Sequence, residues 1–276
     1  MKPRLNLEER RARRRRVVAR SKFALPSAIT LISVLCGFSS IVMSINAAGD
    51  DTSHSFLVAA GLLVLAGVFD GLDGRVARAT NTTSEFGVQL DSLADVLSFG
   101  MAPAILAYRY GFFEFGKVDP RLRAVGWAAS FFFLACGALR LARFNVQVGF
   151  VDSRFFMGMP IPVGAACVAS VIMTWPTPPS HIACAYLFAG ELFVVGLLMI
   201  SNVRFPSFKK ASHHPHANHY LTLGFLVLLT LLIVFREKFF LWFFLAYVLV
   251  TVALNLGWLC GWRGVEPPLQ RVNREE

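Results

Sequence analysis

The sequence has little charge for its length. Charged residues make up 16% of its 276 positions and hydrophobic residues 55%, and the mean hydropathy is +0.57. A soluble globular domain carries about 25% charged residues, so this composition excludes that class. The net charge of +10 does not indicate nucleic-acid binding, because the basic residues lie beside long apolar runs, as they do in membrane proteins. The sequence predicts an integral membrane protein in contact with lipid, with no nucleic-acid partner.

Cysteine is also scarce and scattered. The five cysteines lie far apart in or beside apolar segments, and no two have a CxxC spacing. This excludes the common zinc and redox motifs and predicts that the cysteines serve as small core residues. The sequence also has no internal repeat and no segment typical of a soluble domain.

Long apolar segments are what the sequence has in abundance. A helix needs about 20 apolar residues to cross a bilayer. About eight segments approach that length, which predicts an all-α, polytopic transmembrane helical bundle. They are 28–48, 55–69, 88–108, 124–139, 163–175, 182–200, 221–235 and 239–260.

The basic residues predict how the chain lies in the membrane. Residues 1–25 form a basic segment, 26–210 the main body, 211–262 two further helices and 263–276 a tail. The first apolar run is long enough to span the bilayer, which favours an uncleaved helix over a signal peptide. With an even number of spans, 21 lysines and arginines fall on the side of the termini and 6 on the other. This bias predicts a cell (inner) membrane protein with both termini in the cytoplasm. The basic segment is then a topology determinant or a binding site for anionic lipid.

One polar stretch interrupts the apolar segments, from Asp70 to Asp95. Asp70 and Asp73 are three residues apart, and Asp91 and Asp95 four apart. Each pair therefore lies on one helical face. Four ionised carboxylates repel one another, so either some are protonated or a cation lies among them. Two divalent cations of the Mg²⁺ or Mn²⁺ type would balance four charges. The glycines of the stretch would let a phosphate approach the backbone.

Two other classes of protein could place acids inside a membrane. An ion or proton transporter uses buried acids along its path. However, a cation path gains nothing from the arginines Arg75 and Arg78, which suit a phosphate. A non-catalytic scaffold has no need of four intramembrane acids. If the aspartates only capped helices or paired with the two arginines, an uncompensated negative charge would remain.

The spacing Asp70-x2-Asp73-Gly74-x2-Ala77-Arg78-x8-Gly87-x3-Asp91-x3-Asp95 resembles the signature of the CDP-alcohol phosphatidyltransferases. The resemblance implies a six-helix catalytic core within residues 26–210 and a dinuclear metal site on the four aspartates. It also implies that Asp95 is the general base that deprotonates the attacking alcohol. Phosphoryl transfer depends chiefly on positioning and on neutralising charge, so the residues fit this chemistry.

The same resemblance implies contacts to CDP-diacylglycerol. Gly74 and Arg78 would contact the CDP part, and Ser84 lies where the family often has a hydroxyl. The alternative is that Ser84 only caps the following helix. Thr30 matches a family pattern at the start of the first span, although Ser27 stands where the family has asparagine. The resemblance also implies a homodimer.

A second segment bears on the acceptor alcohol. Gly137-Ala-Leu-Arg140-Leu-Ala-Arg143-Phe-Asn145 and Gly158-Met-Pro160-Ile-Pro162 are similar to the phosphatidylserine synthase branch of the family. Arg140 and Arg143 share a helical face and suit a carboxylate or a phosphate. The resemblance implies L-serine as acceptor, with Arg140, Arg143 and Asn145 as hypothetical contacts. Glycerol 3-phosphate, an inositol phosphate or choline are the alternative acceptors. The arginines could also serve only as membrane anchors.

Overall fold

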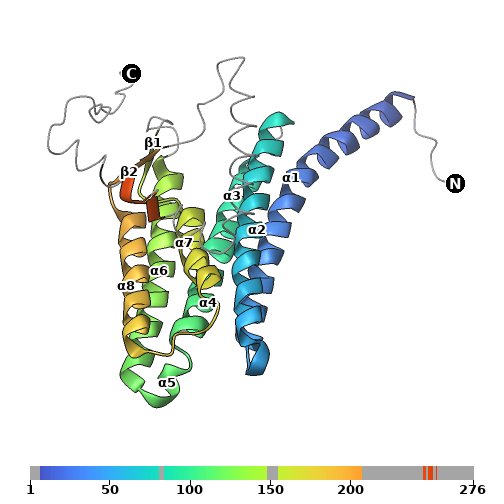
Figure 1. Ribbon diagram of the computed structural model, residues 1–276. Helices are drawn as coiled ribbons and strands as arrows, with labels where there is room; N and C mark the ends of the chain where they lie inside the picture. The colour runs from blue at the N-terminus through green and yellow to red at the C-terminus, as the bar shows by residue number, and fades with distance from the viewer. Residues whose placement is uncertain are drawn as a thin grey trace.

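The computed structural model is a bundle of roughly parallel and antiparallel helices (Figure 1). It describes residues 7–80, 84–147, 155–206, 245–246, 248–250 and 253, with the backbone alone at 7–25, 50, 78, 147, 155–157 and 204–206. The helices are α1 (Leu7–Asn46), α2 (Thr52–Ala79), α3 (Glu85–Asp95), α4 (Ala102–Gly111), α5 (Phe115–Val118), α6 (Pro120–Gln147), α7 (Ile161–Thr174) and α8 (Ile182–Ile200). A 3₁₀ turn, η1 (Gly49–Asp51), precedes α2, and a π-helical turn, η2 (Val96–Met101), joins α3 to α4. There are also two short strands, β1 (Phe155–Met157) and β2 (Arg204–Pro206).

Within the described residues, five helical segments are long and apolar enough to cross a membrane: Pro26–Asn46, Thr52–Ala77, Glu85–Gly111, Pro120–Val146 and Ile182–Ile200. A sixth apolar helix, α7, has 14 residues and measures about 21 Å, which is shorter than the roughly 30 Å of a bilayer core. These helices confirm the prediction of an all-α, polytopic transmembrane bundle. The two spans predicted over 221–235 and 239–260 lie outside the described residues, apart from short helical pieces between 245 and 253.

Helix α1 is much longer than the span predicted from the apolar run. It begins at Leu7 and includes the basic segment, so that it has 40 residues with Pro26 inside it. Arginine is a good helix former, which explains why the helix does not end where the apolar residues do. In Figure 1 its N-terminal part leaves the bundle and projects to one side.

Helices α1 and α2 pack closely along their length. Two small residues at this contact, Ala59 and Ala66 on α2, are fully buried. Ser40 Oγ donates to the carbonyl of Ala59 at 2.8 Å, and Ser33 Oγ donates to that of Ala66 at 3.1 Å. Small residues and interhelical hydrogen bonds are the usual means of helix association in membranes, where burial of apolar surface gives no advantage.

The third span is one continuous helix with a π-helical turn in its middle. The backbone of Asp95 and Ala102, on either side of η2, is α-helical. The amide of Ala102 donates to the carbonyl of Leu97, five residues earlier, which is the π pattern. This turn comes directly after Asp95, the last residue of the polar stretch.

A two-stranded antiparallel ribbon connects the segment after α6 with the end of α8. Its central pair is Phe156 and Phe205. Gly158, directly after β1, has φ +78°, and its amide donates to the Val203 carbonyl at 2.8 Å. A Cβ at this position would collide with the backbone carbonyl of Met199. Glycine is therefore required both by the backbone conformation and by the close approach of α8.

Candidate active site

Three carboxylates from two helices meet at one end of the bundle. Asp70 comes from α2, and Asp91 and Asp95 come from α3. One carboxylate oxygen of each lies within 4.8 Å of the others. The helical spacing predicted that Asp91 and Asp95 would share a face, and the structure places both beside Asp70. Hard divalent cations prefer this kind of oxygen-rich site.

The fourth aspartate turns toward a different helix. Asp73 is 5% exposed, and its Oδ2 accepts a hydrogen bond of 2.6 Å from the hydroxyl of Thr30 on α1. It is not part of the group formed by the other three. Residues three apart on a helix differ by roughly 60° in direction, so Asp70 can face α3 while Asp73 faces α1. The spacing alone could not distinguish these two directions, and Asp73 as a metal ligand stays a prediction.

The surroundings of the Asp95 carboxylate suit a bound cation. Its Oδ1 is buried and accepts no hydrogen bond from any residue that the structure describes. A buried carboxylate oxygen without a donor is costly unless a cation neutralises it. The guanidinium of Arg140, a side chain only 6% exposed, attracts this carboxylate. One guanidinium cannot balance three ionised carboxylates, and the donor set therefore fits divalent cations.

The residues expected to contact CDP lie around this group, with different local roles. Ser84 is the N-cap of α3, where its Oγ accepts a hydrogen bond of 3.0 Å from the amide of Gly87. Ser84 therefore caps α3, and its contact to CDP stays a prediction. Gly74 lies in α2, directly after Asp73. The side chain of Arg78 lies outside the described residues, so its contact to CDP stays a prediction, as do those of Gly74 and Thr30.

The three predicted acceptor residues lie at the aspartate end of α6. Arg140 is the one that interacts with Asp95. Arg143 Nη2 donates to Oδ1 of Asn202 at 2.7 Å, and its Nη1 lies 3.4 Å from the carbonyl of Ile200 at the end of α8. Asn145 Nδ2 donates to Ser92 Oγ at 3.0 Å. The end of α6 is therefore fastened to both α3 and α8.

Asn202 and Ser92 were missed by the sequence reasoning. Ser92 lies next to Asp91 inside the signature, and Asn202 is a polar residue directly after an apolar helix. These positions beside the signature and after an apolar helix could have drawn attention to the two residues. Neither residue, however, belongs to a spacing pattern that indicates a function. Their contacts join segments more than 50 residues apart, which no local pattern reveals.

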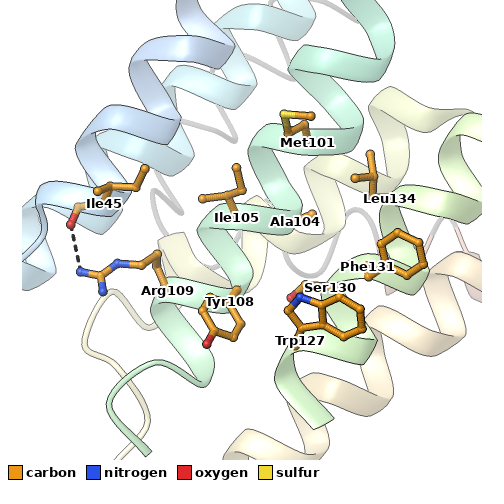
Figure 2. A pocket seen from close by; sticks show the side chains of 10 residues that line it. All are labelled: Ile45, Met101, Ala104, Ile105, Tyr108, Arg109, Trp127, Ser130, Phe131 and Leu134. Carbon is orange, nitrogen blue, oxygen red and sulfur yellow. Dashed lines mark hydrogen bonds between the residues drawn. The ribbon is translucent and has the colours of Figure 1, made fainter. Parts of the chain in front are cut away.

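A cavity of about 360 Å³ lies at the other end of the bundle, away from the carboxylates. Figure 2 shows its apolar lining, which includes Ile45, Met101 and Trp127. Arg109 lies at its edge and donates to the carbonyls of Ser44, Ile45 and Ala47 at 3.0, 3.0 and 3.1 Å. The cavity has none of the aspartates in its lining, so it is not the candidate active site.

The fold and the site together define an integral membrane protein with a carboxylate cluster built by two consecutive transmembrane segments. Comparison with known proteins gives a more specific class. Residues 23–203 match the CDP-alcohol phosphatidyltransferase family. Because that match covers more than half of the chain, the chain belongs to the CDP-alcohol phosphatidyltransferase family.

Curated relatives cover most of the chain. The CDP-diacylglycerol–serine O-phosphatidyltransferase of Helicobacter pylori (strain J99) is 39% identical over 216 residues, which are 77% of this chain and 82% of the relative. The protein of the same name from Methanocaldococcus jannaschii is 34% identical over 181 residues, or 65% and 72% of the two chains. The archaetidylserine synthase of Methanothermobacter thermautotrophicus is 37% identical over 188 residues, or 67% and 71%.

Proposed function

We propose that this protein transfers a phosphatidyl group from CDP-diacylglycerol to the hydroxyl of L-serine, giving phosphatidylserine and CMP. The observation that carries the proposal is the intramembrane group of Asp70, Asp91 and Asp95 in a chain of this family. The relatives reported above, whose names all specify serine, support the acceptor. Family membership also favours group transfer over the transporter alternative.

Two divalent cations, Mg²⁺ or Mn²⁺, are proposed as cofactors. Asp70, Asp91 and Asp95 would hold them, with Asp73 as the fourth ligand expected from the signature. When bound, such ions neutralise the charge of the pyrophosphate and of the departing CMP. The general base and the substrate contacts are proposed to be side chains of the protein.

Asp95 is the proposed general base. In the reaction, the serine hydroxyl oxygen forms a bond to the phosphorus that carries the lipid, and the bond from that phosphorus to CMP breaks. The hydroxyl proton passes to a carboxylate oxygen of Asp95, and its unsatisfied, buried Oδ1 supports this role. General-base help of this kind is worth about 10² to 10⁴ in rate.

The substrate contacts complete the proposal. Thr30, Gly74, Arg78 and Ser84 would bind the CDP part of the lipid. Arg140, Arg143 and Asn145 would bind the acceptor, where a guanidinium suits the serine carboxylate. Glycerol 3-phosphate, an inositol phosphate and choline are the alternative acceptors for the same cluster.

We also propose the orientation and assembly of the protein. The bias of 21 to 6 basic residues supports a cell (inner) membrane protein with its termini and carboxylates on the cytoplasmic side. A homodimer is proposed from the resemblance to the family alone.

The test is an assay of CMP release by the purified, full-length protein in detergent. CDP-diacylglycerol is supplied with each candidate alcohol, after EDTA treatment and with Mg²⁺ or Mn²⁺ restored. We expect release with serine only when a divalent cation is present. Asp95→Asn should abolish it, whereas Asp51→Asn, an exposed aspartate at the opposite end, should not. Release with another alcohol and not with serine would change the acceptor, and no release with any alcohol would refute the enzyme assignment.

A further inference from the structure

The π-helical turn η2 lies between the acidic part and the core part of the third span. The buried residues of α4 form one broad face of the helix: Ala102, Pro103, Ala104, Leu106, Ala107, Tyr110 and Gly111. On an uninterrupted α-helix, the centre of this face would be turned about 100° from the face of Asp91 and Asp95. A π turn contains one extra residue, and one residue corresponds to about 100° of rotation. The turn therefore brings the acidic face of α3 and the buried face of α4 to the same side.

Buried contacts hold this turn in place. Ser98, in the middle of η2, is fully buried, and its Oγ donates to the carbonyl of Ser33 on α1 at 3.2 Å. Gly37, one turn further along α1, lies against the same residue. A Cβ on Gly37 would come within 2.8 Å of the Cα of Ser98. This distance is shorter than van der Waals contact allows, so α1 and η2 could not stay this close with any side chain there.

The same contacts continue to α2. The hydroxyl of Ser33 donates to the carbonyl of Ala66 at 3.1 Å, and Ala66 is four residues, or about one helical turn, before Asp70. Ser98 is three residues after Asp95. A chain of two hydrogen bonds thus joins η2 to α1 and α1 to α2, about one turn below the carboxylates on both helices.

We propose that Ser98, Ser33 and Gly37 are positioning residues that set the separation and rotation of Asp95 relative to Asp70. They do so through the π turn, without contacting a substrate or a cation. The inference rests on the proposed function, because it treats the three carboxylates as one cation site. Outer residues that orient ligands change metal affinity by about 10- to 100-fold.

The experiment measures Mn²⁺ binding to the full-length protein in detergent. Protein freed of metal by EDTA is titrated with Mn²⁺, and free Mn²⁺ is read by EPR spectroscopy, with thermal unfolding measured in parallel. The test variants are Ser98→Ala, Ser33→Ala and Gly37→Ala. Two matched controls are available. Ser40→Ala removes an equivalent hydrogen bond from α1 to an α2 carbonyl, and Gly61→Ala adds a Cβ that meets nothing within 4 Å.

We expect Ser98→Ala and Ser33→Ala to raise the Mn²⁺ dissociation constant about tenfold, and Gly37→Ala to raise it more. Ser40→Ala and Gly61→Ala should leave it unchanged. If Gly37→Ala does not fold, the two serine variants decide. Two results would overturn the proposal: Ser33→Ala and Ser40→Ala change the Mn²⁺ dissociation constant equally, or neither Ser33→Ala nor Ser98→Ala changes it. A merely structural role would lower the unfolding temperature and leave the dissociation constant unchanged.

The failure of this inference is distinguishable from that of the proposed function. One result would support the positioning role and refute the proposed reaction: Mn²⁺ binding depends on Ser98 as expected, but the unchanged protein releases no CMP with any alcohol. The opposite result would refute the positioning role only: the unchanged protein releases CMP, but the variants bind Mn²⁺ as tightly as it does.

Discussion

The hydroxyl of Thr30 on α1 donates a hydrogen bond of 2.6 Å to Oδ2 of Asp73 on α2. Both side chains are buried, and 43 residues separate them in the sequence. The bond fixes the start of the first span against the helix that carries Asp70. It also occupies an oxygen of the one aspartate that does not join the other three.

The first prediction concerns this bond. Thr30→Val should lower the free energy of unfolding by about 1–3 kcal/mol, because it removes the hydroxyl that donates to the buried Asp73 carboxylate. Thermal or denaturant unfolding in detergent measures the loss. Thr30→Ser keeps the hydroxyl and should restore most of the stability. Ser44→Ala is a suitable control, since that buried hydroxyl donates only to the nearby Ile41 carbonyl of the same helix. A valine variant as stable as the serine variant would contradict the prediction.

The second prediction separates the four aspartates. Asp70→Asn, Asp91→Asn and Asp95→Asn should each lose Mn²⁺ binding, since each removes charge from the group of three. Asp73→Asn should weaken binding least, because its carboxylate faces Thr30. EPR titration of the four variants measures the order. An equal loss in Asp73→Asn would instead place Asp73 among the ligands on the same footing as the other three.

A third prediction concerns the acceptor. Asn202 Oδ1 accepts the 2.7 Å hydrogen bond that orients the Arg143 guanidinium. If Arg143 binds serine, Asn202→Ala should raise the KM for serine while changing the KM for CDP-diacylglycerol little. Steady-state assays with each substrate varied in turn measure both constants. Arg143→Ala should raise the KM for serine further, and an unchanged value in that variant would remove Arg143 from the acceptor site.

The fourth prediction tests the ribbon. Gly158→Ala forces a residue with a Cβ into a left-handed conformation, at about 1–2 kcal/mol, and adds a collision with the Met199 carbonyl. We expect a clear fall in the unfolding temperature. Gly190→Ala, on the open side of α8, should not show it, because its Cβ meets nothing within 4 Å. Similar unfolding temperatures for the two variants would show that the ribbon tolerates the change.

The sequence predicted the parts of the fold and site that depend on local pattern. Long apolar runs identify spans because a backbone in lipid must satisfy its own hydrogen bonds. Asp91 and Asp95 lie on one helical face because residues four apart in a helix are about one turn apart. Ser84 as a helix cap is likewise a local matter.

What the sequence could not predict depends on contacts between distant segments. The direction of Asp73 is decided by Thr30, and the position of Arg143 by Asn202. The strands β1 and β2 have three residues each and pair across about 50 residues, so neither has a pattern long enough to detect. The π turn also has no sequence pattern of its own, because the residues of η2 are as apolar as the helix around them.

Helix α1 is held at both ends of its membrane span. Near its start, Thr30 is bonded to Asp73, and at its end Arg109 from α4 donates to the carbonyls of Ser44 and Ile45 and to that of Ala47, the residue after the helix. Hydrogen bonds at both ends oppose a shift of the span along its axis. Pro26, which lacks an amide hydrogen, lies just before the first attachment and leaves a gap in the helical hydrogen bonds. The backbone hydrogen bonding of α1 is therefore weakest at Pro26, between the basic extension and the span that Thr30 and Arg109 attach to its neighbours.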